Sequence, residues 1–329
     1  MPLVAHNALP TFDRLRRDGI TVLSTERAAN QEIRELHVGL RNMMPDAALE
    51  ATERQFYRLV GESNPIAQFY MHPFTLPTLP RSAAAQAHIA QYYEPFESIR
   101  EAGLDALIIT GANVSHPNLA DEAFWEPLIE VIDWAWDHVT STLCSCLATH
   151  AVMQFRHGQK RVKQPRKIWG VFEHRVTDGR HPLVADVNTR FDVPHSRWND
   201  VSHAQFEAAG LKVLVESADA GVHLAVSRDG LRTVFFQGHP EYDTVSLLKE
   251  YKRDLLLAAA GKLASFPPFP ARYFDRQAQA LLAEFGSRTQ AGETLAFPES
   301  LLLPLLDNTW HDTAEAVIGN WIGCVYQVT

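Results

Sequence analysis

The sequence predicts an α/β protein in which helices cover both faces of a parallel or mixed β-sheet. Strand-like and helix-like segments alternate along the chain, which is the pattern of such sheets. Residues 104–110 (LDALIIT) form a short apolar run between two glycines, as expected of a strand that is buried on both faces. At residues 139–155 a β-branched segment continues directly into a helical pattern, which is typical of a strand-to-helix unit.

Local patterns predict the individual elements in chain order. We expect strands at residues 33–40, 67–74, 104–110, 139–145, 211–217, 221–227 and 231–237, and helices at residues 47–60, 124–138, 147–155 and 243–260. Three prolines between residues 265 and 271 end the last of these helices. From residue 274 onward we expect helices that pack back onto the domain, anchored by Trp310, Val317, Trp321 and Ile322. The predicted organisation is an N-terminal extension (1–32), an α/β core (33–262) and a C-terminal helical segment (263–329).

Composition indicates an ordinary globular protein of the cytoplasm. The chain has 329 residues, of which 46% are hydrophobic, so it can bury a large core. Its net charge of -9 argues against nucleic-acid or membrane partners, and we interpret the basic clusters at residues 14–17 and 160–167 as solvated faces. We find neither a secretory signal nor a run of ~18 apolar residues that could span a membrane. Three cysteines do not make a disulfide framework in so long a chain, which fits a reducing compartment.

Cys146 is the candidate nucleophile. It stands where the strand-like segment VTSTLCS passes into a helical pattern, so we expect it at the carboxyl end of a sheet strand and beside a helix N-terminus. The partial positive charge of that terminus favours a thiolate, and the backbone N–H of Leu147 can stabilise an oxyanion. The alternative is an inert buried thiol, because free cysteine is among the most buried residue types.

The neighbouring cysteine and histidine residues have simpler interpretations. Cys144 lies inside the strand and Cys324 in an apolar tail, so we expect both in the core. Cys144, Cys146 and His150 form C-x-C-x3-H, but structural zinc sites usually pair cysteines as C-x2-4-C and need four ligands. We therefore expect no metal. His150 could be a base carried by the helix, but a satisfied or exposed histidine is the favoured interpretation.

His239 and Glu241 are the candidate base and its orienting carboxylate. They follow the apolar segment FFQG directly, and a cysteine nucleophile needs both an imidazole and an acceptor that fixes its tautomer. Pro240 stiffens the turn between them. A surface turn is the alternative for these residues taken alone, and the functional interpretation gains weight because Cys146 also ends a strand.

The chain resembles the homoserine O-acyltransferases (homoserine O-succinyltransferases), a family of methionine biosynthesis. The likeness spans residues 33–329 and is carried by MMP and TERQF (43–56), LDALIITGA, HVTSTL-x-x-C, GVFEH (170–174), PHSR (194–197), GHPEYD with EYKRD, and the terminal NWIGCVYQVT. The combination of PHSR with GHPEYD and EYxRD is specific. The resemblance implies a flavodoxin-like core related to class I glutamine amidotransferases, and a homodimer.

The resemblance also implies roles for particular residues. It makes Cys146 the acyl-thioester nucleophile, His239 the proton acceptor and Glu241 its partner in a ping-pong reaction. The implied co-substrate is acyl-CoA, with no bound cofactor, and the acceptor is the side-chain hydroxyl of L-homoserine. Substrate-site roles fall to Lys167, Ser196 and Arg253. The guanidinium fork of Arg253 suits an amino-acid carboxylate, Ser196 supplies a small donor and acceptor, and Lys167 supplies a cation.

The chain departs from the family pattern at three places. Leu147 and His150 replace an aromatic residue and an amide after the nucleophile. Residues 46–48 read Asp-Ala-Ala, where relatives carry lysines that contribute to donor binding. Ser115 occupies the position tied to acyl choice, where a glutamate would repel a succinyl carboxylate. A small hydrogen-bonding serine favours succinyl-CoA over acetyl-CoA.

Three other interpretations remain open at this stage. One is a hydrolase or amidotransferase that uses the same Cys-His-Glu set, although class I amidotransferases flank their cysteine with glycines. Another is a ligand-binding relative that has lost catalysis. The third keeps the chemistry and changes the acceptor to serine or the donor to acetyl-CoA, because one methylene shifts selectivity by only ~1–3 kcal/mol.

Overall fold

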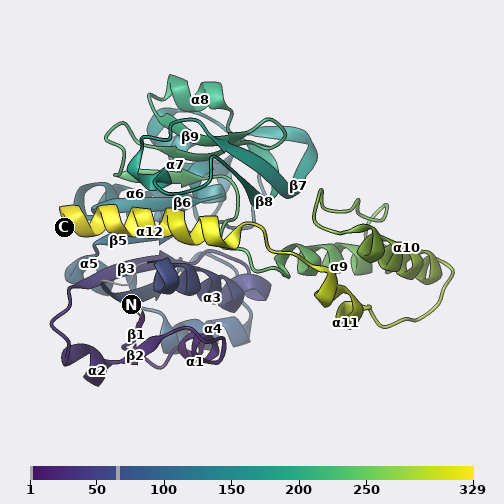
Figure 1. The fold of residues 1–329 in the computed structure, drawn as a ribbon, viewed down its shortest axis with the longest axis horizontal. Helices are drawn as coiled ribbons and strands as arrows, with labels where there is room; N and C mark the ends of the chain where they lie inside the picture. The colour runs from purple at the N-terminus through teal and green to yellow at the C-terminus, as the bar shows by residue number, and fades with distance from the viewer. Residues whose placement is uncertain (1–2, 64–66) are drawn as a thin grey trace.

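The computed structural model describes residues 3–63 and 67–329, and its centre is one large twisted sheet (Figure 1). The strands are β1 (Leu3–Ala5), β2 (Val22–Ser24), β3 (Glu35–Arg41), β4 (Gln68–Phe74), β5 (Ala106–Ile109), β6 (Ser141–Ser145), β7 (Val162–Val176), β8 (Arg190–Asp200), β9 (Lys212–Ser217), β10 (Gly221–Val226) and β11 (Thr233–Phe236). Their order in the sheet is β2-β1-β4-β3-β5-β6-β11-β10-β9-β7-β8. Neighbouring strands from β2 to β11 run parallel, and those from β11 to β8 run antiparallel. The predicted α/β class with a mixed, mostly parallel sheet is confirmed.

Helices cover both faces of this sheet. The longer ones are α1 (Pro10–Arg17), α3 (Asp46–Ser63), α4 (Ala83–Tyr92), α6 (Trp125–His138), α7 (Leu147–His157), α9 (Ser246–Ala259), α10 (Arg276–Gln290) and α12 (His311–Val328); the shorter ones are α2 (Thr25–Ala29), α5 (Phe96–Ala102), α8 (His203–Ala208) and α11 (Glu299–Leu302). On one face α1, α3 and α12 bury Phe12, Tyr57 and Trp321 against the strands. On the other face α5, α6 and α7 bury Ile99, Leu128 and Ala148.

Every strand and helix expected between residues 33 and 260 is present, and one large feature was missed. β7 and β8 form a long antiparallel hairpin that pairs, for example, Trp169 with Ser196. The basic segment 160–167 lies at its start, and most of its side chains are exposed. Arg161 and Lys167 are partly buried and paired, so the interpretation as a solvated face is wrong for these two residues. Residues 1–32, predicted as an extension, add β1 and β2 to the sheet. The proposed division of the chain at residues 32 and 262 stays a prediction.

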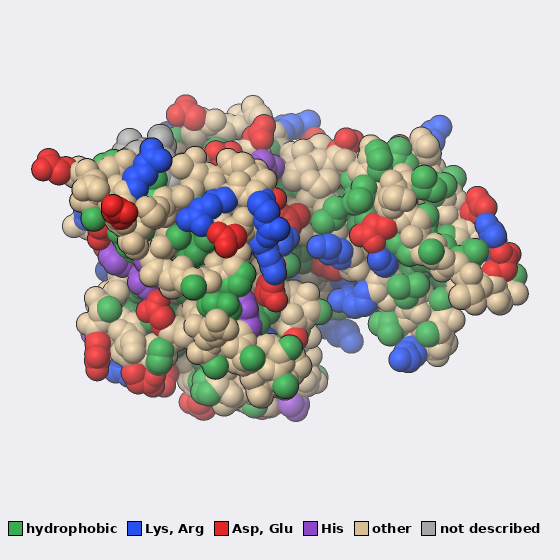
Figure 2. All heavy atoms as spheres, turned by 90° about the horizontal axis from the view of Figure 1, so that it is seen from below, with side chains coloured by type: hydrophobic (Ala, Val, Ile, Leu, Met, Phe, Trp, Pro, Cys, Tyr) green, Lys and Arg blue, Asp and Glu red, His purple; other side chains and the backbone are tan. Residues whose placement is uncertain are grey.

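The C-terminal segment forms a lobe beside the sheet and then returns to it. Helices α9, α10 and α11 share a separate apolar cluster that includes Tyr251, Phe285 and Trp310 (Figure 1). Figure 2 shows an indentation between this lobe and the main body, with Lys and Arg side chains along it. The lobe is tied to β7 at Gly170, whose φ is 138°; a Cβ there would lie 2.3 Å from the Ala271 carbonyl oxygen. Only glycine fits this contact.

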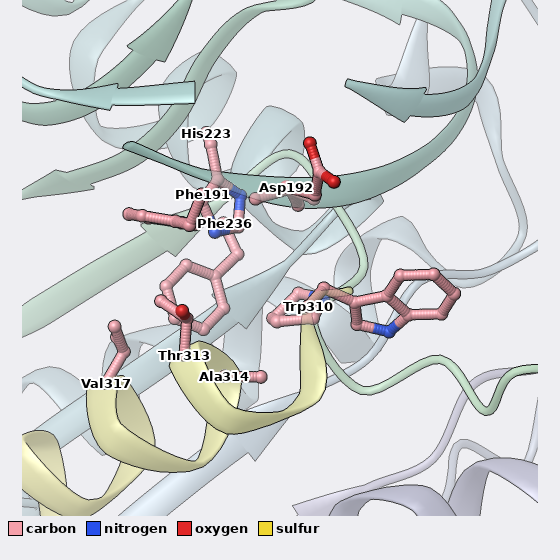
Figure 3. A pocket seen from close by; sticks show the side chains of 10 residues that line it. Phe191, Asp192, His223, Phe236, Trp310, Thr313, Ala314 and Val317 are labelled. Atoms are coloured by element: carbon pink, nitrogen blue, oxygen red, sulfur yellow. The ribbon is translucent and has the colours of Figure 1, made fainter. Parts of the chain in front are cut away.

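Helix α12 supports the strand that leads into the predicted base. Its anchors Trp310, Val317, Trp321 and Ile322 are all buried, as expected. Figure 3 shows Ala314 and Val317 of α12 beneath Phe236 of β11, around a small cavity of about 10 Å³. The imidazole of His223 stacks on Phe236 with ring centroids 5.0 Å apart. The carboxyl end of β11 therefore packs against α12 and the His223 ring.

Candidate functional site

Cys146 occupies a strained turn between β6 and α7. Its backbone has φ 51° and ψ -105°, a conformation that residues with a side chain rarely adopt. The turn is held by a hydrogen bond from the Cys146 N–H to the Phe236 carbonyl at the end of β11, at 2.7 Å. The residue is partly exposed, unlike Cys144. The backbone thus presents this thiol at the edge of the sheet.

The space beside the thiol is suited to a developing oxyanion. Leu147 is the first residue of α7, so its N–H is one of the four helix-initial donors that have no intrahelical acceptor. Gly111 faces it from the loop after β5: a Cβ on Gly111 would lie 4.0 Å from the Leu147 nitrogen and 3.8 Å from the Cys146 Cβ. The absence of a side chain at Gly111 thus lets the loop after β5 approach this donor closely.

His239 and Glu241 lie beside this cysteine. Strands β6 and β11 are parallel neighbours, with Ser145 paired to Phe236, so their carboxyl ends meet. The His239 Nδ1 is 2.8 Å from the Glu241 Oε1, and both side chains are buried. Burial disfavours the imidazolium, but the Glu241 carboxylate and the charge and hydrogen bonding of Cys146 raise the pKa of His239 well above its ordinary value. The imidazole is therefore poised to hold a proton beside Cys146.

The loop that carries His239 contacts strand β8. The His239 N–H donates to the Pro194 carbonyl of β8 at 2.8 Å. A Cβ on Gly238 would lie 2.5 Å from Val193 and 2.8 Å from the His195 ring, so only glycine allows this approach. Burial lowers the pKa of His195 well below its ordinary value, which keeps that imidazole neutral. The PHSR and GHPEYD segments are thus one packed unit.

A second polar group adjoins the imidazole and centres on Glu250 of α9. Its Oε2 accepts from the Ser196 hydroxyl at 2.5 Å and from the Lys167 ammonium at 3.1 Å. Its Oε1 accepts from the Tyr242 hydroxyl at 2.8 Å. Burial opposes ionisation of Glu250, but Lys167, Ser196 and Tyr242 together hold its pKa below the usual range. The ring of Tyr242 stacks on His239 with centroids 4.4 Å apart, which joins the two groups.

Arg253 is less closely integrated than Lys167 and Ser196. It lies three residues after Glu250 on α9, and its Nε donates to Asp254 at 2.8 Å. Its side chain is 61% exposed. The hydrogen bond with Asp254 raises the pKa of Arg253, as do the charges of Glu250 and Tyr242. Two of the three predicted substrate residues, Lys167 and Ser196, therefore share the Glu250 carboxylate. The third, Arg253, lies on the same helix as Glu250 and is mostly exposed.

Ser115 lies in an exposed loop after β5. Its N–H and that of His116 both donate to the Glu122 Oε1 at 2.6 Å. Arg161, at the start of the β7–β8 hairpin, donates to the carbonyl of His116 at 3.1 Å. Burial lowers the pKa of Arg161, and the charges of Glu122 and Cys146 oppose this shift. A cation therefore contacts the loop of Ser115, and its charge interacts with that of Cys146.

The other residues singled out from the sequence have structural roles. His150 is buried, its Nε2 is 3.0 Å from the Gln237 Oε1, and burial lowers its pKa to about 3, so it is not a base. Cys144 is in the core, and burial raises the pKa of its thiol. Cys324 packs against the core but is only partly buried. At the segment without lysines, the nearly buried Arg81 guanidinium pairs with Asp46 at 3.3 Å.

Three residues of the site were missed from the sequence. Glu250 and Tyr242 belong to the EYKRD and GHPEYD segments, so their position in these blocks was the available signal. Arg161 belongs to the basic cluster that we interpreted as a solvated face. Each gains its significance from a contact between distant segments, which sequence spacing does not report.

The fold and the site together define a class of protein. It is an α/β protein in which a thiol, an imidazole and a carboxylate lie next to one another at the carboxyl ends of parallel strands. This is the arrangement that activates a nucleophile for acyl transfer. No helix among the described residues is long and apolar enough to cross a bilayer.

The chain belongs to the homoserine O-succinyltransferase family, whose model matches residues 2–329. A homoserine O-succinyltransferase of Thiobacillus denitrificans is 87% identical, over 100% of this chain and 94% of the relative. One from Allochromatium vinosum is 65% identical with the same coverage. Among solved structures, a glutamine amidotransferase from Thermotoga maritima overlaps 90% of this chain and 99% of its own, with a TM-score of 0.45 and 10% identity.

Proposed function

We propose that this chain transfers the succinyl group of succinyl-CoA to the hydroxyl of L-homoserine through a thioester on Cys146. The observation that supports this most directly is the strained Cys146 turn beside the His239–Glu241 pair. Family membership supports the substrates. The setting is methionine biosynthesis in the cytoplasm, and the homodimer stays a prediction.

The first half-reaction acylates the enzyme. The Cys146 thiolate attacks the thioester carbonyl, and the oxyanion forms next to the Leu147 N–H. The carbon–sulfur bond to CoA breaks, and the CoA sulfur takes the proton held by His239. One thioester replaces another, so the step costs little free energy. The basic side chains along the indentation in Figure 2 suit the phosphates of CoA.

The second half-reaction transfers the acyl group. His239, now neutral and oriented by Glu241, accepts the proton of the homoserine hydroxyl as its oxygen attacks the acyl carbon. Cys146 leaves as thiolate, and His239 retains the proton for the next cycle. Lys167, Ser196 and Arg253 surround the amino-acid part, with Arg253 on the α-carboxylate. Glu250, which accepts from Lys167 and Ser196, is placed to receive the α-ammonium group.

The test is to look for the intermediate. The protein is incubated with succinyl-CoA or acetyl-CoA without acceptor and analysed by intact and peptide mass spectrometry. We expect a succinyl adduct on Cys146 that homoserine discharges faster than serine or water. Product formation with no adduct at any time would contradict the ping-pong mechanism. Discharge by water alone, or turnover of glutamine, would favour the hydrolase or amidotransferase interpretation.

Arg161 is the proposed partner of the succinyl carboxylate. Its guanidinium donates to the His116 and Pro117 carbonyls in the Ser115 loop, and its charge interacts with that of Cys146. Its buried Nε has no hydrogen-bond partner among the described residues. A hydrogen bond to a charged group contributes ~1.5–3 kcal/mol. Arg161→Gln should therefore lower kcat/KM for succinyl-CoA by ~10–100-fold and leave that for acetyl-CoA nearly unchanged.

Steady-state kinetics with both donors measure this change in preference. Arg166→Gln is the matched control, because Arg166 is an exposed residue of β7, the strand that begins directly after Arg161. An equal loss with both donors would assign Arg161 to the CoA portion or to the fold instead.

A further inference from the structure

A cluster of histidines lies in the part of the sheet formed by β1, β4 and β3, away from the thiol site. His6 follows β1, His72 is in β4, and Glu94 follows α4; one ligand atom from each lies within 4.8 Å of the other two. His37 of β3 adds a third imidazole, with its Nδ1 2.9 Å from the His72 Nε2. All four side chains are partly buried. Four segments that are distant in sequence therefore bring three imidazoles and a carboxylate together.

The hydrogen bonds of His6 leave one of its ring nitrogens available as a metal ligand. The Nδ1 of His6 is 3.2 Å from the Val4 carbonyl, so it carries the proton and donates, which leaves Nε2 with a lone pair. The nearest group to that Nε2 is the Asn7 amide nitrogen at 3.4 Å, a long contact. Such a backbone carbonyl is a common partner for the distal N–H of a metal-bound histidine.

His72 is oriented in a similar way. Its Nδ1 is 2.7 Å from the Glu94 Oε1, and its Nε2 faces the His37 Nδ1. When Nε2 donates its proton to His37, Nδ1 is free to bind a metal together with Glu94. The ring of His37 is itself held by stacking on Tyr70, with centroids 5.1 Å apart.

We propose that His6, His72 and Glu94 bind a divalent transition-metal ion of the zinc type, with His37 as the residue that orients His72. Imidazole and carboxylate ligands suit zinc, and three protein ligands leave a fourth position for water. Ligand atoms around tetrahedral zinc, at ~2.0–2.1 Å from the metal, are ~3.3 Å apart, so small side-chain movements complete the site. Binding replaces the hydrogen bond between His72 and Glu94, and the proton of the neutral His72 ring moves from Nδ1 to Nε2, from which it is donated to His37.

The ion would fasten the N-terminal segment to the sheet. Within residues 3–63 and 67–329, β1 pairs with β4 at one register position, Leu3 with Phe69, and His6 follows β1 directly. A metal held by His6, His72 and Glu94 adds a cross-link at this edge. β3 and β5 separate β4 from β6, so the site is distinct from the thiol site. The proposal departs from the expectation that the chain holds no metal.

Metal titration of the full chain, dialysed against chelator, tests the proposal. Co²⁺ serves as the spectroscopic probe and Zn²⁺ as its competitor. We expect one equivalent to bind with a d–d spectrum of nitrogen and oxygen ligands and no sulfur-to-cobalt band, and the melting temperature to rise with Zn²⁺ concentration. His37→Gln should weaken binding by ~10–100-fold, and His6→Gln and Glu94→Gln should weaken it further.

His203→Gln is the control, because it removes a histidine that pairs with Glu216 at 2.6 Å on a different part of the surface. Circular dichroism verifies that each variant is folded, and Glu94→Gln carries the test if His6→Gln is not. Absence of stoichiometric binding, a sulfur-to-cobalt band, or unchanged affinity in both folded ligand variants would overturn the proposal. Acyl-transfer activity is not a readout, so a failure here leaves the proposed function intact.

Discussion

Replacing Cys146 by alanine should reduce acyl transfer by ~10⁴-fold or more while the chain stays folded. The thiol is the only proposed acceptor of the succinyl group, and the remaining Leu147 N–H and His239 cannot form a thioester. The side chain is partly exposed, so its removal leaves no large cavity in the core. Product formation from succinyl-CoA and homoserine, followed by mass spectrometry, measures the loss.

Cys324→Ala is the matched control for this variant. Cys324 is also partly buried but lies on α12, among residues that pack on the opposite face of the sheet from α7. It should retain activity close to that of the native chain. If Cys146→Ala kept substantial turnover with an unchanged melting temperature, the nucleophile would have to be another group.

The juxtaposition of Cys146 and His239 could be predicted because it depends on a general property of parallel sheets. Each residue follows a buried apolar strand, and the carboxyl ends of parallel strands meet at one edge. Sequence periodicity identified both strands, β6 and β11. The positive φ of Cys146 was not predicted, because no glycine marks the turn.

The β7–β8 hairpin was missed for a physical reason. Its strands lie near the edge of the sheet and are only partly covered, so their apolar residues form neither a continuous run nor a clean alternation. Much of the proposed substrate site depends on this hairpin, since Lys167 and Ser196 belong to its two strands. Their meeting on Glu250 of α9 is a tertiary contact between three distant segments.

Glu250 also connects the proposed acceptor site to the candidate base His239. Its carboxylate accepts from Ser196 and Lys167 on one side and from Tyr242 on the other, and the Tyr242 ring stacks on His239. Binding of an α-ammonium group to Glu250 would therefore place the homoserine side chain near the imidazole. EYKRD lies on α9, which begins at Ser246, a few residues after GHPEYD, so the two segments are close in sequence as well as in contact.

Replacing Glu241 by glutamine should lower kcat/KM by ~10²–10⁴-fold and move the alkylation of Cys146 to higher pH. The carboxylate and Cys146 overcome the effect of burial and raise the pKa of His239. Without the Glu241 charge, burial again favours the neutral ring, so the pKa of His239 falls. The imidazole then loses its proton at a lower pH, and the thiolate loses its cationic partner. A thiol without that partner ionises at higher pH.

The rate of iodoacetamide labelling as a function of pH measures this shift independently of turnover. Glu241→Asp is the informative comparison, since it retains the charge and shortens its reach; its profile should lie between those of the native chain and Glu241→Gln. The second carboxylate oxygen of Glu241, Oε2, is buried and has no hydrogen-bond partner among the described residues. The amide of Glu241→Gln therefore removes little besides the negative charge of Glu241 beside His239. A loss of activity with an unmoved labelling profile would mean that Glu241 only positions the ring and does not set its charge.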